Sequence, residues 1–264
     1  MPIPFPDSPS NRLDSAPAAN PRLAAARVFI LGAGGLGAPV ALFLAQTGIG
    51  HLVIADGDRV ELSNLHRQIL HVTPGVGLPK AESARQTLQR SHPATRVTPI
   101  HLRITETTIA NAVTGCDLVV DGSDNFEARY LLNRICMTRR IPLVSGAVLG
   151  FEGQVATFRH GVDPEAPCYQ CLHPGIKQHG CGPESPIPTC ATAGVLGPVA
   201  GVIGALQATE AIQTLLNRQP SPANGSIWLI NLRDQFWLRV AIPKNPACPV
   251  CAAPQAGPVS RPAS

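Results

Sequence analysis

The sequence predicts an α/β fold in which a mostly parallel sheet carries helices on both faces and continues into an antiparallel C-terminal portion. Short apolar runs alternate with helix-like stretches from about residue 24 to 147. A glycine-rich turn follows the first apolar run, and two Cys-x-x-Cys pairs lie in the second half. Alternating strand and helix units favour a parallel sheet, and the glycine turn makes it Rossmann-like. The cysteine pairs add a zinc site with four cysteine ligands to the prediction.

The first half of the chain supplies the alternating units. We expect strands at 28–31, 52–55, 97–102, 118–120 and 143–147. We expect helices at 38–47, 62–70, 80–91, 107–113 and 125–139. Ser123 and Asp124 precede the last of these helices and are suitable N-cap residues, because their side-chain oxygens can accept hydrogen bonds from free helix N–H groups.

The second half has a different character. A strand is expected at 154–158, a long loop rich in Pro, Gly and Cys at 164–189, and an apolar helix at 194–216. Strands at 226–232 and 236–242, joined by Arg233-Asp-Gln, predict an antiparallel hairpin. We therefore expect one domain over 23–251, with a disordered arm over 1–22 and a disordered tail over 252–264.

Composition argues against several classes of function. The 264 residues are 44% hydrophobic, and the net charge of +4 forms no basic stripe, so we expect no nucleic-acid partner. The start of the chain lacks the basic and apolar regions of a secretory signal, and the most apolar segment, 195–208, is too short to cross a bilayer. We expect a cytoplasmic protein with no membrane partner, whose eight cysteines serve metal binding or catalysis.

The glycine turn has the spacing Gly32-x-Gly34-x-x-Gly37, with a further glycine, Gly35, inside it. It lies between an expected strand and an expected helix, which is the context of a phosphate-binding turn. Glycines let the backbone approach a pyrophosphate, and the helix N-terminus supplies free N–H groups. The motif alone leaves open whether the chemistry is hydride transfer or attack on a phosphate.

Polar residues follow the second expected strand. Asp56 lies 19 residues after Gly37, where a carboxylate can accept hydrogen bonds from a ribose hydroxyl, and Asp58 follows it. The first turns of the next expected helix carry Ser63, Asn64, Arg67 and Gln68. Arg67 is suited to bidentate phosphate binding. The alternative is that Arg67 and Gln68 are solvated surface residues.

Lys80 and Asp124 are further candidates. Lys80 begins an expected helix, where its ammonium gains nothing from the helix dipole, so its position favours an anion in the same site. Asp124 follows the fourth strand, at the sheet edge that faces the ligand crevice, and could hold Mg²⁺ against phosphate oxygens. The alternative for Asp124 is a helix cap.

The two Cys-x-x-Cys pairs supply four thiolates, the complement of a closed tetrahedral zinc site; they are Cys168, Cys171, Cys248 and Cys251. A closed site of this kind stabilises a fold and leaves no open position for catalysis. The alternatives are a redox pair or unligated thiols. A redox pair should begin a helix, and the prolines around both pairs argue against that position.

Cys190 belongs to neither pair and precedes the apolar helix, where the pKa of a thiol can be lowered and the thiolate can act as a nucleophile. The alternative is a small buried hydrophobic residue, which we expect Cys116 and Cys136 to be. Cys181, in the loop, is a weaker candidate.

Together these residues resemble the MoeB/ThiF (HesA/MoeB/ThiF) family of adenylyltransferases, bacterial relatives of ubiquitin-activating enzymes. The resemblance runs from about residue 23 to 251. It rests on many short motifs in one order: the glycine turn, Asp56-x-Asp58 with Ser63-Asn-Leu-His-Arg-Gln68, Gly77-x-x-Lys80, Ser123-Asp-Asn125, Ser145-Gly-Ala147, Glu152-Gly-Gln154, both cysteine pairs, and Cys190 leading into Ala193-Gly-Val-Leu-Gly-Pro198.

The resemblance implies a reaction with ATP and Mg²⁺ rather than NAD. In such enzymes the C-terminal glycine carboxylate of a ubiquitin-like sulfur carrier ending in Gly-Gly attacks the α-phosphate, and an acyl-adenylate and pyrophosphate form. The carriers serve molybdopterin or thiamine (thiazole) biosynthesis. The resemblance also implies a homodimer, and we expect a separate sulfur donor, a cysteine desulfurase or rhodanese.

Residue roles carry over by position. Gly35 would lie under the phosphates, Asp56 would hold the ribose and Asp124 would bind Mg²⁺, while phosphate contacts would come from Asn64, Arg67 and Lys80. In thiazole-pathway members the cysteine matching Cys190 can join covalently to the carrier, and in molybdopterin-pathway members it is dispensable.

The chain departs from the family in one segment. Members usually carry Arg-Tyr-x-Arg-Gln about twenty residues before the glycine strand, and this segment supplies an arginine to the partner subunit's ATP. Here the region reads Pro6-Asp-Ser-Pro-Ser-Asn-Arg12-Leu, and Arg12 and Arg22 lack those neighbours. Two other interpretations remain: a scaffold that binds ATP or a ubiquitin-like protein without turnover, and an NAD-dependent oxidoreductase, which the glycine turn alone allows.

Overall fold

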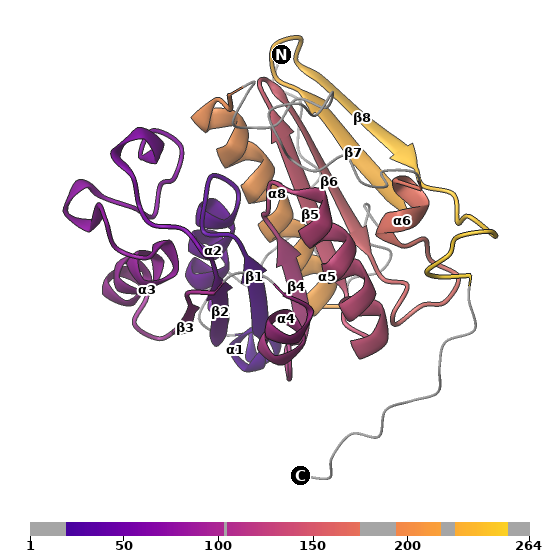
Figure 1. Ribbon diagram of the computed structural model, residues 1–264, viewed down its shortest axis with the longest axis horizontal. Coiled ribbons are helices and arrows are strands. Elements are labelled where there is room, and N and C mark those ends of the chain that lie inside the picture. Colours follow the sequence, from indigo (N-terminus) through magenta and orange to yellow (C-terminus); the bar gives the residue numbers. More distant parts are fainter. Residues whose placement is uncertain (1–19, 103–104, 175–193, 218–224, 253–264) are drawn as a thin grey trace, which may run out of the picture.

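The computed structural model describes residues 20–102, 105–174, 194–217 and 225–252, which form one mixed sheet of eight strands in the order β3-β2-β1-β4-β5-β6-β7-β8. The strands from β3 to β5 are parallel, and the strands from β6 to β8 are antiparallel, as the sequence predicts. The strand bounds are β1 Arg27–Leu31, β2 His51–Ala55, β3 Arg96–Ile100, β4 Leu118–Asp121, β5 Leu143–Leu149, β6 Glu152–Phe158, β7 Ser226–Asn231 and β8 Phe236–Ala241. Strands β3 and β8 form the two edges (Figure 1).

Helices cover both faces of the sheet. One face packs against α1 (Pro21–Ala25), α2 (Gly37–Gln46), α3 (Lys80–Ser91) and α8 (Gly197–Leu215). The other face packs against α4 (Glu106–Ala112), α5 (Phe126–Arg139) and α6 (Tyr169–Leu172). Side chains of β1 alternate between the two cores because successive residues of a strand point to opposite faces.

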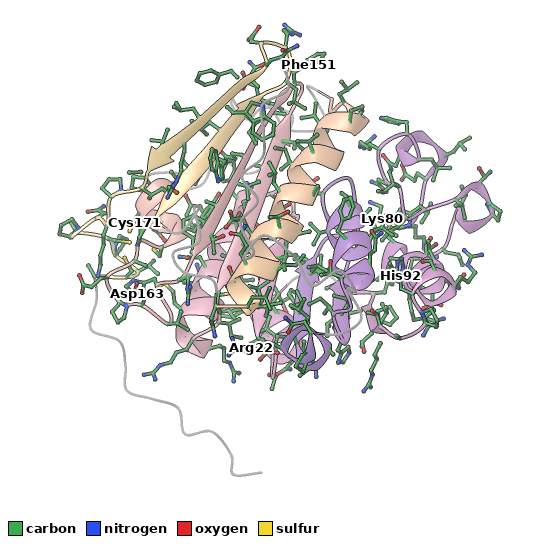
Figure 2. The ribbon with its side chains drawn as sticks, turned by 180° about the vertical axis from the view of Figure 1, so that it is seen from behind. Arg22, Lys80, His92, Phe151, Asp163 and Cys171 are labelled. Carbon is green, nitrogen blue, oxygen red and sulfur yellow. The ribbon has the colours of Figure 1, made fainter. Side chains whose placement is uncertain are left out.

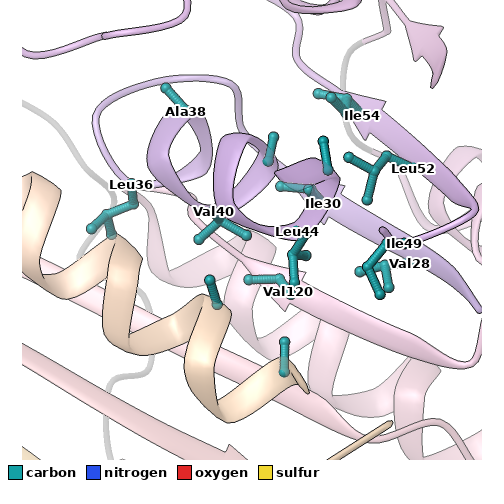
Figure 3. Packing of buried hydrophobic residues seen from close by; sticks show 14 of the residues in the cluster. Val28, Ile30, Leu36, Ala38, Val40, Leu44, Ile49, Leu52, Ile54 and Val120 are labelled. Carbon is teal, nitrogen blue, oxygen red and sulfur yellow. The ribbon is translucent and has the colours of Figure 1, made fainter. Parts of the chain in front are cut away.

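The core between α2, α8 and the sheet depends on close helix packing. Figure 3 shows Val40 and Leu44 of α2 packed among side chains from β1, β2 and β4. Helix α8 approaches α2 at Gly204, where a Cβ atom would lie 2.4 Å from Cγ of Pro39 and 2.8 Å from the Leu36 carbonyl oxygen. Only glycine leaves room for this approach, which brings the start of α8 next to the glycine turn.

The order of the strands reverses between β1 and β4, so the loops that follow these two strands meet at the carboxyl edge of the sheet. Gly32 has a φ of +89°, and a Cβ atom there would lie 2.9 Å from the carbonyl oxygen of Gly122. A Cβ atom on Gly37 would lie 1.8 Å from the carbonyl oxygen of Gly32. In open α/β sheets, ligands bind at this kind of switch point.

Segment 62–70 is the main departure from the sequence prediction, because the expected helix is absent. The chain forms the 3₁₀ turn η3 (Leu62–Asn64) there instead, and a second 3₁₀ turn, η4 (Thr73–Gly75), follows the segment. The Glu61 carboxylate accepts hydrogen bonds from the Ser63 hydroxyl and the Asn64 amide, both at 3.3 Å. Such local side-chain bonds compete with helix formation.

Three smaller differences from the sequence prediction concern helices. Asn125, rather than Ser123 or Asp124, is the N-cap of α5, because its Oδ1 accepts a hydrogen bond from the Ala128 N–H at 2.8 Å. The loop expected at 164–189 contains the one-turn helix α6. Residues 21 and 22, assigned to the arm from the sequence, lie in α1. The other elements agree with the predicted ones to within a few residues.

Of the helices in the described ranges, none combines the length and the hydropathy that a membrane crossing needs.

Two glycines one turn apart in α8 offer a matched test of this packing. A Cβ atom on Gly201 would meet nothing within 4 Å, whereas one on Gly204 would collide with α2. We expect Gly201→Ala to raise the free energy of unfolding by about 1 kcal/mol, because alanine favours helix. We expect Gly204→Ala to lower it by about 2 kcal/mol through overpacking. Urea denaturation of both variants checks the pair, and equal effects would contradict the packing described here.

Candidate active site

The turn between β1 and α2 presents a set of free backbone donors. The Ala33 N–H donates to Oδ2 of Asp56 at 2.7 Å, and the Ala38 N–H donates to the Gly34 carbonyl at 3.0 Å. In the described part of the chain, no acceptor faces the four N–H groups between them, those of Gly34, Gly35, Leu36 and Gly37. Free N–H groups at the start of a helix form an anion-binding site.

Asp56 anchors this turn from the end of β2. Its carboxylate is 9% exposed; Oδ2 accepts from Ala33, and Oδ1 accepts from the N–H of Asp58 at 2.8 Å. Hydrogen bonds to an ionised acceptor are roughly twice as strong as neutral ones, so the carboxylate fixes the turn firmly. The residue expected to hold a ribose therefore also shapes the phosphate-facing loop.

Lys80 lies at the start of α3 and has an anionic partner within the chain. Its Nζ lies 2.8 Å from Oδ2 of Asp58, and the Lys80 side chain is 8% exposed whereas that of Asp58 is 74% exposed. The sequence suggested that an anion shares the site of Lys80, and in this structure Asp58 is that anion. The pair places a buried ammonium beside a carboxylate that faces solvent.

The segment before Lys80 brings further polar groups to the glycine turn. Gln68 is 4% exposed, its Oε1 is buried without a hydrogen-bond partner, and its Nε2 lies 3.5 Å from the position of a Cβ atom on Gly34. Arg67 is half-buried and donates to Oδ1 of Asn64 at 2.6 Å. The solvated-surface interpretation is therefore wrong for Gln68. Ser63 is exposed and lies further out.

The start of helix α8 lies against both the glycine turn and the polar segment around Arg67. A Cβ atom on Gly35 would lie 3.4 Å from Cβ of Ala200 and 3.9 Å from Cγ of Arg67. A Cβ atom on Gly197 would lie 2.6 Å from the carbonyl oxygen of His66. The glycine turn, the polar segment and the start of α8 therefore converge on one place.

Asp124 lies in the loop between β4 and α5 and is exposed. It does not cap α5, and within the described ranges its carboxylate has no hydrogen bond or ion pair. Its neighbour Ser123 is held on two sides, since its N–H and hydroxyl donate to Oδ1 of Asp121 at 3.0 and 2.6 Å, and its carbonyl accepts from Arg129 at 2.7 Å. A rigid loop thus presents a free carboxylate.

Sequence reasoning missed several buried residues that support these loops. Nε of Arg129 lies 3.8 Å from Oδ2 of Asp121, and both residues are buried. The Ser145 hydroxyl donates to the same Asp121 oxygen at 2.9 Å. His71 contacts the Ala33 carbonyl through Nε2 at 2.8 Å. The position of Asp121 at a strand end was a signal in the sequence, but no spacing marked His71.

His71 carries the clearest electrostatic perturbation next to the turn. Burial lowers the pKa of His71 from its ordinary value of 6.5; Asp56 opposes this shift and Lys80 adds to it. The second ring nitrogen, Nδ1, lies 3.0 Å from the Ser83 hydroxyl. The ring is therefore held in its neutral form at neutral pH.

The four paired cysteines form a separate, compact cluster. Their sulfur atoms all lie within 4.8 Å of one another, with Cys168 and Cys248 at 3.7 Å and Cys171 and Cys251 at 3.4 Å. Zinc–sulfur bonds of about 2.3 Å in a tetrahedron place sulfur atoms about 3.8 Å apart, so the cluster fits this metal. Figure 2 labels Cys171 and Lys80 on opposite sides of the molecule.

The first Cys-x-x-Cys pair differs from the sequence expectation in its position. Cys168 is the N-cap of α6, so this pair does begin a helix, although one of a single turn. The interpretation as an isolated redox pair is nevertheless disfavoured, because the second pair lies against the first and the Asn245 N–H points to the Cys171 sulfur at 3.5 Å. Backbone N–H groups aimed at sulfur are a common feature around metal-bound thiolates.

The remaining cysteines divide into two groups. Cys116 and Cys136 are buried in the core, as the sequence predicts. Cys181 and Cys190 lie outside the described residues, so the nucleophile expected at Cys190 stays a prediction.

Comparison with known proteins identifies the family. The family model described as ThiF family matches residues 13–250. The chain belongs to the ThiF family. It is 40% identical to the molybdopterin-synthase adenylyltransferase of Salmonella typhimurium, over 86% of this chain and 87% of that protein. It is also 40% identical to the sulfur carrier protein ThiS adenylyltransferase of Escherichia coli, over 90% of each chain.

A solved structure agrees with this assignment to the ThiF family. The E. coli MccB structure with ATP has a TM-score of 0.75 and 25% identity, over 87% of this chain and 67% of that chain. The agreement between fold, sequence motifs and relatives confirms the resemblance seen in the sequence, and it leaves the NAD-dependent oxidoreductase interpretation without support.

The pKa of His71 gives a prediction for stability against pH. Because the folded-state pKa lies below 6.5, the unfolded chain binds more protons as the pH falls through that value, and the free energy of unfolding decreases. The slope is at most about 1.4 kcal/mol per pH unit for each proton. We expect urea denaturation at pH 7.5 and 5.5 to show a smaller difference in His71→Gln than in the parent chain. An unchanged difference would contradict this role.

Proposed function

We propose that this ThiF-family chain is an ATP-dependent adenylyltransferase. It activates the C-terminal glycine carboxylate of a ubiquitin-like sulfur-carrier protein as an acyl-adenylate and releases pyrophosphate, for molybdopterin or thiazole biosynthesis. The observation that carries the proposal is the row of free N–H groups from Gly34 to Gly37 in the described chain, next to Arg67 and beneath the start of α8. The relatives at 40% identity support the same reaction.

The nucleotide site follows from these groups. The free N–H groups would bind phosphate oxygens, and the phosphate chain would continue toward Arg67, Asn64 and Lys80. Asp56, at the end of β2, would accept the ribose hydroxyls with its remaining lone pairs. The exposed carboxylate of Asp124 fits a Mg²⁺ ligand, because nothing in the described chain occupies it. When bound, Mg²⁺ neutralises phosphate charge.

The reaction needs positioning and charge stabilisation rather than a protein nucleophile. A carboxylate oxygen of the carrier's terminal glycine forms a bond to the α-phosphorus, and the bond from that phosphorus to the pyrophosphate oxygen breaks. Negative charge gathers on the phosphate oxygens and on the leaving group. In this proposal Arg67, Lys80 and the free N–H groups would offset this charge.

Two exposed apolar surfaces support protein partners. Strand β8 exposes large apolar side chains along the sheet edge: Phe236, Trp237, Leu238 and Val240. We propose this edge as the docking surface of the sulfur carrier. A second set of exposed apolar side chains lies on the segment from η3 to the residue after η4 and at the start of α8: Leu62, Ile69, Val72, Val76 and Leu196. We propose that a second copy of the chain covers this set, in a homodimer, and that sulfur comes from a separate donor protein.

We propose zinc as the metal of the cysteine cluster. Four sulfur atoms at tetrahedral spacing leave no open coordination position, so the metal would join the segment after β6 to the C-terminal segment and take no part in the reaction.

The reaction predicts ATP–pyrophosphate exchange that depends on a carrier. We expect purified protein with Mg²⁺ and one Gly-Gly carrier of the same cell to catalyse exchange, measured with labelled pyrophosphate. Asp124→Ala should lower the rate at least about 100-fold, because the free carboxylate of the β4–α5 loop is lost. Asp163→Ala removes an exposed carboxylate on the side of the cysteine cluster and should stay within about twofold of the parent rate.

Two outcomes would contradict the proposal. No exchange with any carrier, despite measurable ATP binding, would favour the scaffold interpretation and would point to the missing Arg-Tyr-x-Arg-Gln segment as its cause. Equal loss in Asp124→Ala and Asp163→Ala would mean that Asp124 has no special role.

The metal proposal has its own test. We expect elemental analysis to find about one zinc ion per chain. Cys171→Ser should lose the metal and lower the free energy of unfolding by on the order of several kcal/mol, because metal binding is coupled to folding. Cys116→Ala, a buried cysteine outside the cluster, should keep the zinc. Equal zinc content in both variants would overturn the assignment.

A further inference from the structure

His71 occupies an unusual place for a residue outside the phosphate-facing segments. It is 4% exposed, Nε2 lies 2.8 Å from the Ala33 carbonyl oxygen, and Nδ1 lies 3.0 Å from the Ser83 hydroxyl. A carbonyl oxygen only accepts hydrogen bonds, so Nε2 carries the proton. In the neutral ring Nδ1 then accepts from Ser83. Both ring nitrogens are therefore committed to defined partners.

The Ala33 carbonyl is the acceptor that one further backbone hydrogen bond at the start of α2 would use. In an α-helix, the N–H of a residue donates to the carbonyl four residues earlier, which for Gly37 is that of Ala33. Helix α2 begins at Gly37, and in the described chain the N–H of Gly37 has no acceptor. His71 contacts this carbonyl, and no backbone N–H of the described chain donates to it.

The same residue is also held from its other side. The Ala33 N–H donates to Asp56 while the Ala33 carbonyl accepts from His71, so both backbone groups of Ala33 are engaged by side chains. Two side chains from different segments thus fix the direction of the backbone as it enters Gly34 and Gly35.

The imidazole also connects the glycine turn to α3. Ser83 lies three residues after Lys80, on the first turn of the same helix. One ring therefore bridges the loop that would bind phosphates and the helix that carries the phosphate-binding lysine.

We propose that His71 is a positioning residue for nucleotide binding: by holding the Ala33 carbonyl and the Ser83 hydroxyl, it fixes the position of the glycine turn, with its N–H groups of Gly34 to Gly37, relative to Lys80. This inference rests on the proposed function, since it concerns ATP as the ligand. His71 itself touches no substrate, and its effect passes through the backbone of the turn.

The test compares variants that differ in one hydrogen bond. Glutamine can place its amide N–H near the position of Nε2, whereas asparagine is too short to reach Ala33 and leucine has no donor. We expect His71→Asn and His71→Leu to weaken Mg·ATP binding, measured by calorimetry, and to raise KM for ATP about tenfold with kcat within about threefold. His71→Gln should restore both values to within about threefold of the parent.

A matched control and a spectroscopic measurement separate positioning from general stability. His160 is 3% exposed and contacts the Ala166 carbonyl at 2.7 Å, so His160→Asn removes an equally buried contact far from the turn. We expect it to leave KM for ATP unchanged. In ligand-free protein, ¹⁵N NMR of the imidazole at pH 7.5 should show the Nε2–H tautomer of His71.

The outcomes distinguish this inference from the function on which it rests. Failure of the parent protein to bind ATP would overturn both. Exchange activity in the parent, together with equal ATP affinity in His71→Asn, would overturn only the role of His71. A Nδ1–H tautomer, or a failure of His71→Gln to restore KM, would also overturn it.

Discussion

The structure depends on the close backbone contact between the turn after β1 and the turn after β4. Gly32 and Gly37 of the β1–α2 turn approach each other and Gly122 so closely that a single Cβ atom on either residue would strike a carbonyl oxygen, at 1.8 to 2.9 Å. Because side chains are absent there, the turns after β1 and β4 come together at the carboxyl edge of the sheet. The free N–H groups and Asp124 thereby lie on neighbouring loops at the same edge of the sheet.

Much of the fold could be predicted from the sequence, because alternation of apolar runs and helices reports directly on strand order and on burial. The five parallel strands, the C-terminal hairpin and the long helix α8 follow from that signal. The prediction was wrong at 62–70, where apolar residues occur at helical spacing but Ser63 and Asn64 bond to Glu61. The spacing of apolar residues carries no information about hydrogen bonds between neighbouring polar side chains, so it could not predict this difference.

The candidate site was predictable where a motif is local. The glycine turn and the cysteine pairs have fixed spacings, so the free N–H groups and the sulfur cluster lie where the sequence placed them. His71 and Arg129 were missed because each contacts a backbone carbonyl of another segment. His71 contacts the Ala33 carbonyl and Arg129 the Ser123 carbonyl, and no sequence spacing indicates either contact. The choice between Asn125 and Asp124 as helix cap also depends on backbone direction, which residue type alone does not specify.

The ion pair between Lys80 and Asp58 has a consequence for selectivity. A buried ammonium that already faces a carboxylate attracts a further anion more weakly than an unpaired ammonium does, because the carboxylate offsets its charge. An incoming anion competes with Asp58 for the Lys80 ammonium, and it displaces Asp58 only if it carries more negative charge. A singly charged ion such as chloride or a lone carboxylate brings no more charge than the aspartate does, whereas a polyphosphate brings several charges. Under the proposed function, the pair would therefore favour a polyphosphate over small singly charged anions.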